Sequence, residues 1–299
     1  MKLLIQLTFN NGLGNLYCGA VELLNFASYY KNLGYECELI FASNGNAGPN
    51  KFIGQVNIEE IFDLTVFDLF DNISNVTNSI GEKNYLGYQY HSTQYGPDHP
   101  GAHWWDVYFD VLPEEVYPKY AFNMETLVSG KHVPTIIPKL NHKIYEKVDN
   151  FIQKNGTIDN VIQVRFFDFS LNPPENFKDY CKKIKERIEE SDQKFYFTSH
   201  NKYAIDLMSD LKNVVMYEYQ NMDELPNDHS YYFYHKNFDR EILLNRLYDN
   251  LAEMSLISKC KKVYYSTPYG WMTTFLYYSK SNNPELELIN INNNINLIT

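Results

Sequence analysis

The beginning of the chain has the order strand, turn, helix and strand, and this order constrains the fold more than any other feature of the sequence. Residues 3–9 are apolar and β-capable, and residues 10–12 (Asn-Asn-Gly) interrupt them. Apolar residues then recur at helical spacing over residues 15–32, Gly34 stands where a C-terminal cap belongs, and residues 37–41 form another apolar run. Because parallel strands joined by a helix occur in layered α/β domains, the sequence predicts such a domain here.

The second half of the chain continues the alternation. We expect strands at residues 161–166, 195–198, 214–217, 263–265 and 286–291, and helices at residues 178–190, 203–211, 241–258 and 271–278. This order predicts a second, doubly wound α/β unit. A helix at residues 143–153 is expected to join the two units, and the Gly-, Pro- and Asn-rich stretch at residues 81–101 is interpreted as long loops.

Charge and length exclude several classes of function for this 299-residue chain. A net charge of −11 argues against binding to the phosphate backbone of nucleic acids, which needs a basic surface. The longest apolar runs, such as residues 3–9, are far shorter than the roughly 20 residues that span a bilayer. No basic segment followed by an apolar one begins the chain, so we expect no secretory signal and a soluble, cytoplasmic protein without a transmembrane segment. The four cysteines form no C-x-x-C pair and are expected to be buried thiols.

A glycine-rich turn, Gly12-Leu13-Gly14-Asn15, follows the first predicted strand and opens the helix. Glycines let the backbone approach a ligand closely, and a helix N-terminus offers unpaired N–H groups to an anion. A dinucleotide fingerprint needs a third glycine at a fixed spacing and an acidic residue at the end of the second strand, and the chain has neither. The turn is therefore interpreted as an anion site, with a tight turn that binds nothing as the alternative.

An arginine closes the strand predicted at residues 161–166. Arg165 is costly in a buried strand unless it meets an anion or faces a cleft, and its guanidinium matches a pair of pyrophosphate oxygens. Asp168 could orient Arg165 or accept a hydrogen bond from a nucleotide base. The alternative is a structural Arg165–Asp168 ion pair.

Two further strand ends carry polar residues. Ser266, Thr267 and Tyr269 follow the strand at residues 263–265, where a helix start and hydroxyl groups favour an anion, although capping of the helix by Ser266 or Thr267 explains the serine and threonine equally well. Thr198 ends its strand in the same way, and its neighbour His200 is interpreted as a packed or surface histidine.

No metal cofactor is expected. The 17 aspartates never stand as Asp-x-Asp, the pattern that holds a divalent cation against a diphosphate, and no standard ligand spacing occurs. A bound diphosphate would have to be neutralised by Arg165 and by helix N-termini.

The order of these motifs resembles the superfamily of α1,2- and α1,6-fucosyltransferases and protein O-fucosyltransferases. Gly12-Leu13-Gly14-Asn15 is similar to the family's G-x-G-N opening, and Gln163-Val164-Arg165-Phe166-Phe167-Asp168 is similar to its H-x-R-R-G-D motif. Residues 195–199 fall where the family has a strand ending in T/S-D-D. Residues 253–276 resemble the family's C-terminal motif, with Cys260 in register and Trp271 in register once one residue is deleted.

This resemblance implies a metal-independent, inverting glycosyltransferase of the GT-B fold, with two Rossmann-like domains facing across a cleft. Residues 1–150 would form the acceptor-side domain, and residues 151–299 the domain that binds the nucleotide-sugar donor. The family's essential arginine falls on Arg165 and the asparagine of its G-x-G-N motif on Asn15, so these two are the candidate catalytic residues. The candidate donor-binding residues are Gly12, Gly14, Asp168, Thr198, Ser266, Thr267 and Tyr269.

The chain departs from the family's motifs at several positions. Phe166 replaces the second arginine of H-x-R-R-G-D and Gln163 replaces its histidine, while Thr198-Ser199-His200 stands in place of T/S-D-D.

We therefore expect transfer of a sugar, with fucose favoured, from a nucleotide diphosphate, with GDP favoured, to a hydroxyl group of a glycan. The acceptor-side candidates are Asp98, Asp106 and Glu22 as general bases and Trp104, Trp105, Tyr88 and Tyr90 as residues that stack on sugar rings. Two other functions stay open: an NAD(P)-dependent oxidoreductase that uses the same glycine turn, and a non-catalytic sugar-binding protein that kept the scaffold.

Overall fold

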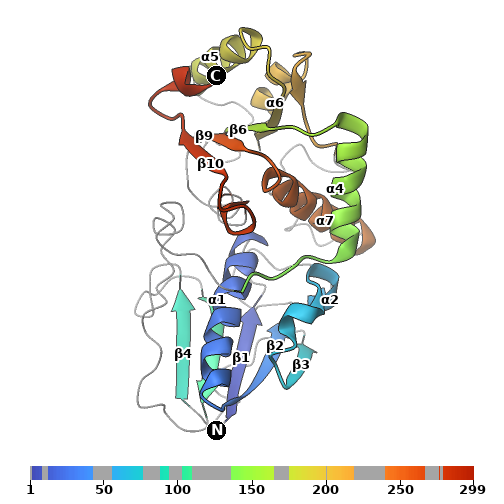
Figure 1. Cartoon of the computed structure of the whole chain (residues 1–299), viewed down its shortest axis with the longest axis vertical. Coiled ribbons are helices and arrows are strands. Elements are labelled where there is room, and N and C mark those ends of the chain that lie inside the picture. The colour runs from blue at the N-terminus through green and yellow to red at the C-terminus, as the bar shows by residue number, and fades with distance from the viewer. Residues whose placement is uncertain are drawn as a thin grey trace. The chain divides into compact units, whose positions relative to one another are not determined.

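The chain forms two compact units, which are described separately below. The computed structural model in Figure 1 describes residues 2–8, 13–42, 56–76, 88–93, 103–109, 136–164, 175–199, 201–218, 240–266, 276 and 279–299. Unit 1 comprises Met1–His142 and Lys236–Arg240, and unit 2 comprises Lys143–His235 and Glu241–Thr299. The chain passes from unit 1 to unit 2 at the first residue of helix α4 (His142–Asn155) and again at the first residue of helix α7 (Arg240–Ile257).

Unit 1 begins with the predicted strand–helix–strand order. Strands β1 (Lys2–Thr8) and β2 (Glu36–Ala42) are parallel neighbours, and helix α1 (Leu13–Asn32) connects them. Along β1, Leu3, Ile5 and Leu7 are completely buried, as expected for alternate residues on the core face of a strand. The prediction of an α/β unit at the beginning of the chain is confirmed.

The C-terminus of α1 is closed by the predicted glycine cap. Gly34 has φ of 87°, in the left-handed region. Its N–H donates to the carbonyl oxygen of Lys31 at 2.9 Å, and the N–H of Tyr35 donates to that of Tyr30 at 3.1 Å. This pair of bonds is a Schellman motif, which requires a positive φ at the position of the glycine.

Gly34→Ala is expected to lower the free energy of unfolding by about 1 kcal/mol, because alanine at positive φ is strained and no atom near Gly34 would clash with the added Cβ. Urea denaturation measures this difference. Asn32→Ala, at the last residue of α1, is the control and should change stability by less than about 0.5 kcal/mol. Equal losses in the two variants would contradict the assignment of the cost to the backbone.

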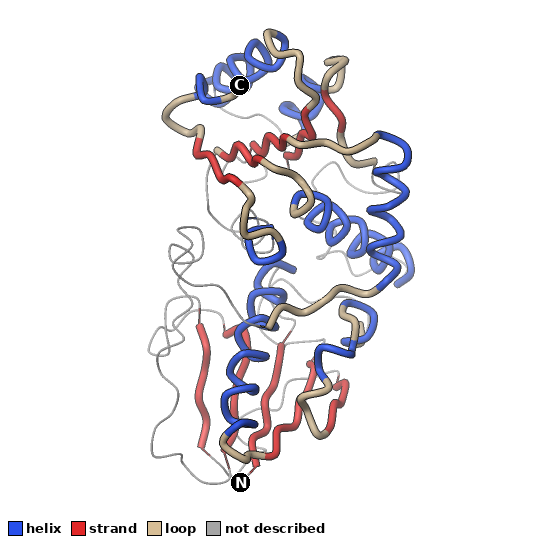
Figure 2. The backbone as a smooth tube through the Cα atoms, in the orientation of Figure 1, coloured by secondary structure: helices blue, strands red, loops and turns tan. Residues whose placement is uncertain are grey.

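Three further strands complete the sheet of unit 1. They are β3 (Asn72–Val76), β4 (Tyr88–Thr93) and β5 (His103–Phe109), and the strand order is β3-β2-β1-β5-β4. Figure 2 shows these strands in red, and β5 is antiparallel to both β1 and β4. The interpretation of residues 81–101 as loops is therefore wrong at β4. The Gly- and Pro-rich segments around this short strand are typical of loops, and the strand is recognised only by its pairing with β5, the next strand along the chain.

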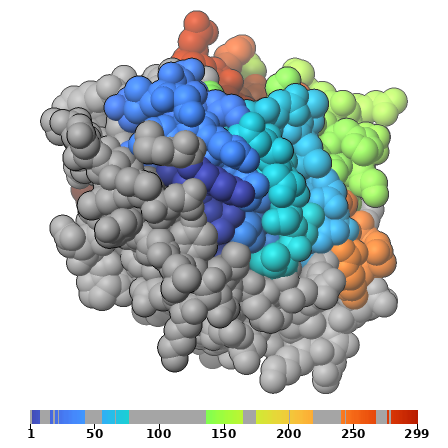
Figure 3. Space-filling model, turned by 90° about the horizontal axis from the view of Figure 1, so that it is seen from below, coloured from blue at the N-terminus to red at the C-terminus, as the bar shows by residue number. Residues whose placement is uncertain are grey.

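The other edge of this sheet carries two short helical segments before β3. Helix α2 (Ile58–Ile61) and the 3₁₀ helix η1 (Leu64–Phe67) precede β3, which pairs in parallel with β2. In the space-filling view of Figure 3, residues 56–76 (light blue to cyan) lie beside residues 2–42 (darker blue), as this pairing requires.

Unit 2 is the predicted doubly wound unit. Its five strands run in the order β10-β9-β6-β7-β8, and all neighbouring pairs are parallel. The elements after α4 are β6 (Asn160–Val164), α5 (Glu175–Glu189), β7 (Phe195–Ser199), α6 (Lys202–Met208), β8 (Val214–Val215), α7, β9 (Lys262–Tyr265), β10 (Glu287–Asn290) and the 3₁₀ helix η5 (Ile295–Leu297). The helix predicted at residues 271–278 lies outside the described residues except for Leu276. None of the helices in the described part of the chain is long and apolar enough to cross a membrane.

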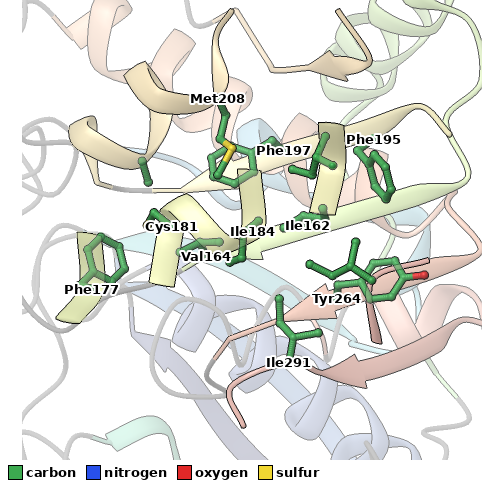
Figure 4. Packing of buried hydrophobic residues seen from close by; sticks show 13 residues of the cluster. Ile162, Val164, Phe177, Cys181, Ile184, Phe195, Phe197, Met208, Tyr264 and Ile291 are labelled. Carbon is green, nitrogen blue, oxygen red and sulfur yellow. The ribbon is translucent and has the colours of Figure 1, made fainter. Parts of the chain in front are cut away.

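The two faces of the unit 2 sheet are covered by different helices. On one face, Ile162 and Val164 of β6 pack with Ile184 of α5 and Met208 of α6 in the cluster of Figure 4. On the other face, the Tyr196 hydroxyl of β7 donates to Glu253 Oε1 of α7 at 2.7 Å, and the Tyr196 ring packs edge-on against a phenylalanine of α4.

The described cysteine side chains are buried thiols, as predicted. They belong to Cys37, Cys181 and Cys260. Burial raises the pKa of Cys37 to about 11 and the pKa values of Cys181 and Cys260 to about 12, so all three stay protonated at neutral pH. The side chain of Cys18 lies outside the described residues.

Candidate functional site

The carboxyl ends of neighbouring strands in unit 2 align four polar or partly polar residues. The register of β7, β6, β9 and β10 puts Thr198, Gln163, Tyr265 and Asn290 in one row, which we call the polar row. Because side chains alternate along a strand, these residues share the face of the sheet that α4 and α7 cover. Ligands of open α/β sheets bind at the carboxyl ends of the strands, so the polar row is the candidate site.

Gln163 is the central residue of the polar row. Its side chain is only 1% exposed, and its Oε1 atom accepts no hydrogen bond from any residue that the structure describes. An unsatisfied buried acceptor costs about 1–3 kcal/mol, which an apolar residue at this position would avoid. This oxygen can therefore accept a hydrogen bond from a donor outside the described residues, such as a ligand.

The neighbours of Gln163 in the polar row are uncharged. Tyr265 has a side-chain hydrogen bond with Asn290, and burial raises the pKa of Tyr265 although that bond opposes the rise. Tyr265 is therefore a neutral phenol at pH 7. Thr198 is buried on the other side of Gln163. Neutral donors and acceptors of this kind suit a nucleoside base or a sugar hydroxyl better than a phosphate group.

Backbone bonds fix the residues around the row. Ser266 follows β9 directly, is buried, and donates its N–H to the carbonyl oxygen of Gln163 at 3.1 Å. The structure thus brings the predicted residues Thr198 and Ser266 to the strands on either side of β6. Ser199 has a structural role, because its Oγ accepts the N–H of Asn201 at 3.1 Å, and Asn201 in turn caps α6 by accepting the N–H of Ala204 at 3.3 Å.

The remaining candidates of unit 2 lie outside the described residues. They are Arg165, Asp168, Thr267 and Tyr269, together with His200. Arg165 follows Val164, the last residue of β6, in the sequence, and its role stays a prediction.

In unit 1, the glycine-rich turn leads into the first turn of α1. Gly14 and Asn15 are the second and third residues of this helix, while Gly12 lies outside the described residues. The first N–H groups of a helix have no intrahelical acceptor, and no acidic residue stands in this first turn. The start of α1 therefore has the backbone geometry and the positive potential that an anion needs. The role of the Asn15 side chain stays a prediction.

The acceptor-side candidates are distributed over the sheet and helix of unit 1. Trp104, Trp105 and Asp106 lie on β5, Tyr88 and Tyr90 on β4 and Glu22 on α1, and only their backbone is described. Asp106 and Trp105 are consecutive residues of a strand, so they belong to opposite faces of the sheet. Asp98 lies outside the described residues.

Sequence reasoning treated Gln163 only as a departure from a family motif and did not group it with Tyr265 and Asn290. A signal was present, since a glutamine interrupts the apolar run Val-Ile-Gln-Val in a strand buried on both faces. The grouping itself needs the strand register, which the sequence does not contain.

The two-unit α/β fold is similar to that of solved fucosyltransferase structures. The chain matches the crystal structure of fucosyltransferase NodZ from Bradyrhizobium with a TM-score of 0.50 and 11% identity over 95% of this chain and 94% of that chain. A NodZ α-1,6-fucosyltransferase co-crystallised with GDP matches with a TM-score of 0.48 and 11% identity, over 95% of this chain and 93% of that one. No protein-family model and no curated protein matches the sequence. At this identity the likeness shows the fold alone, and it confirms the two α/β units that the motif resemblance implied.

Proposed function

We propose that the protein is a glycosyltransferase that moves a sugar from a nucleotide diphosphate donor to a hydroxyl group of a glycan. The unsatisfied Oε1 of Gln163 carries the proposal, because at this edge of a parallel sheet it calls for a donor such as the N–H of a base or a ribose hydroxyl. The fold of a fucosyltransferase and the order of the motifs favour GDP-fucose as the donor.

The reaction breaks the bond between the anomeric carbon of the sugar and an oxygen of the diphosphate, which keeps the electron pair. The acceptor oxygen forms the new bond from the opposite side, which inverts the anomeric centre, and its proton passes to a base. Arg165 would stabilise the developing charge on the diphosphate, and one such preorganised contact is worth about 3–4 kcal/mol. The proposed mechanism uses no metal ion, since Arg165 carries the positive charge that would neutralise the diphosphate.

Thermal unfolding with GDP, UDP and NAD tests the choice of ligand. GDP at about 100 times its Kd should stabilise the protein by about 2.7 kcal/mol, whereas NAD should not. Stabilisation by NAD alone would favour an oxidoreductase instead. Release of GDP from GDP-fucose, unchanged by EDTA, is the expected sign of metal-independent turnover. A protein that binds GDP but releases none from GDP-fucose would instead be a non-catalytic sugar-binding protein.

Gln163→Met is expected to stabilise the ligand-free protein by about 1 kcal/mol and to weaken GDP binding about tenfold, because it removes a buried unsatisfied oxygen that the ligand would satisfy. Urea denaturation and calorimetric titration measure the two effects. Asn160→Leu is the matched control on the same strand. Asn160 is also buried, but its side chain donates to Gln193 Oε1 at 2.6 Å, so this variant should lose stability and keep its affinity for GDP. A destabilised Gln163→Met variant with unchanged GDP affinity would contradict the role of Gln163.

A further inference from the structure

Helix α7 turns a stripe of polar side chains toward the sheet of unit 2. Arg246, then Asp249 or Asn250, and then Glu253 follow one another at intervals of three or four residues, so they lie along one face of the helix, and all four are buried. The Glu253 carboxylate accepts the Tyr196 hydroxyl of β7 at 2.7 Å, so this face is turned to the sheet. The stripe therefore covers the same face of the sheet as the polar row, which begins on β7 two residues after Tyr196.

Asn250 differs from the two carboxylates of the stripe in its hydrogen bonds. Asp249 accepts a hydrogen bond from Lys147 at 2.8 Å, and Glu253 accepts the one from Tyr196. The Asn250 side chain is only 6% exposed, and none of the residues that the structure describes forms a hydrogen bond with it. Because burial of an unpartnered amide is unfavourable, Asn250 is a polar group that can bond a group outside the described residues, such as a ligand.

The direction of α7 puts Asn250 close to the level of the polar row. A short turn leads from α7 to Lys262, the first residue of β9, whose N–H donates to the carbonyl oxygen of Asp159 directly before β6. The C-terminus of α7 therefore lies at the amino ends of the strands, and earlier residues of the helix lie nearer to the carboxyl ends. Asn250 precedes Glu253 by three residues, or about 4.5 Å along the helix, and the polar row follows Tyr196 by two residues, or about 6.6 Å along the strand.

Helix geometry also puts Asn250 on the flank of α7 that faces away from α4. Asp249 points toward α4, where Lys147 Nζ lies 2.8 Å from its Oδ1. Asn250 is the next residue and is rotated by about 100° around the helix axis, so it belongs to the other flank of the buried face. Phe151 of α4 packs on rings of β7 and of the segment after β8. In the strand order of this sheet, the other flank of α7 lies toward β6, the strand of Gln163.

We propose that Asn250 is a specificity-determining residue that contacts the base of the nucleotide sugar together with Gln163. The assignment rests on the glycosyl transfer proposed above, and both residues belong to unit 2. A side-chain amide carries an acceptor and two donors in one plane, and the edge of a base likewise carries donors and acceptors side by side. A phosphate group offers acceptors only and is matched by positive charge, which neither amide has.

The two amides do not satisfy each other. Gln163 Oε1 accepts no hydrogen bond from any described residue, although an asparagine amide has two N–H groups to donate. A base that bonds both residues satisfies both: one of its N–H groups donates to Gln163 Oε1, and its carbonyl oxygen or ring nitrogen accepts an N–H of Asn250. Asn250 thus adds a contact from the helix to the contact that Gln163 makes from the sheet.

Calorimetric titration of Asn250→Leu with GDP and with UDP tests this assignment. The variant should bind the nucleotide that wild type prefers, which we expect to be GDP, at least about tenfold more weakly, because a side chain of similar size replaces the amide. Its affinity for the other nucleotide should change less than about threefold, so the preference is lost. The midpoint of urea unfolding without ligand should be unchanged or higher, since no described residue loses a hydrogen bond. Asn245→Leu, a partly exposed position on another side of the same helix, is the matched control and should keep both affinities.

Two outcomes overturn this assignment alone. One is an Asn250→Leu variant that binds the preferred nucleotide within about threefold of wild type, whether or not its stability changes. The other is an equal loss of affinity for GDP and UDP, which would place Asn250 at the ribose or the diphosphate that both nucleotides share. A wild-type protein that binds neither nucleotide overturns the proposed function itself, and the assignment of Asn250 falls with it.

Discussion

Arg165→Ala is expected to lower the rate of sugar transfer by about a thousandfold while the protein stays folded. Arg165 follows Val164, the last residue of β6, in the sequence, and we propose that it binds the donor phosphate. Loss of one preorganised donor to the developing charge typically costs about 10²–10³ in kcat. Arg165→Lys should recover only part of the rate, because an ammonium group lacks the planar fork that binds two oxygens at once.

The control for Arg165→Ala is Arg187→Ala on α5. Arg187 is partly exposed, pairs with Glu190 at 2.8 Å and donates to Asn296, so its removal should leave GDP release close to wild type and lower stability by less than about 1 kcal/mol. Rates of GDP release from GDP-fucose and thermal unfolding curves separate loss of activity from loss of fold. Near wild-type turnover in Arg165→Ala would remove this residue from the mechanism, even if GDP still binds.

The two units could be predicted because most of their helices and strands have a hydrophobic pattern that is visible within a few residues of sequence. Strand β6 is apolar apart from Asn160 and Gln163, and α5 alternates buried and charged residues at helical spacing, so both were predicted within a few residues. Strand β4 could not, because its six residues lie between glycine- and proline-rich segments and are recognised as a strand only through pairing with β5.

The sequence predicts which strand ends carry the candidate site residues, but it does not predict which of these residues are neighbours across the sheet. Thr198 and Ser266 were proposed from the rule that ligands bind at carboxyl ends, and the structure brings them to either side of Gln163. The pairing of Gln163 with Tyr265 depends on register, which the sequence does not contain.

The packing of helix α7 also could not be predicted from the sequence. The sequence predicts a helix at residues 241–258, and the structure buries three charged residues of this helix, Arg246, Asp249 and Glu253. A sequence pattern cannot distinguish such residues from a solvated helix face, because their partners lie on other elements. Two partners of Asp249 lie on other parts of the chain. The Nζ of Lys147 on α4 lies 2.8 Å from Asp249 Oδ1, and the Tyr217 hydroxyl donates to the same oxygen at 3.2 Å.

Lys147→Met is accordingly expected to lower the free energy of unfolding by about 3 kcal/mol, because it withdraws a positive charge from a carboxylate that is only 1% exposed. Asp249→Asn should cost less, since the Lys147 side chain remains 17% exposed and can turn its ammonium group toward water. The double variant should be more stable than Lys147→Met alone, because Asp249→Asn removes the buried negative charge that Lys147 balances in the wild type. Urea denaturation of the four proteins gives this coupling energy directly.

The same helix supplies a control for this pair. Lys154 of α4 lies 2.7 Å from Glu218, about the same separation, but the two side chains are 62% and 80% exposed. Because water screens an exposed ion pair, Lys154→Met should change stability by less than about 1 kcal/mol. Equal losses for Lys147→Met and Lys154→Met would mean that burial of Asp249 adds nothing to the cost. A larger loss for Lys147→Met would show that α4 and α7 are joined over the sheet by a charge pair whose strength comes from its exclusion from water.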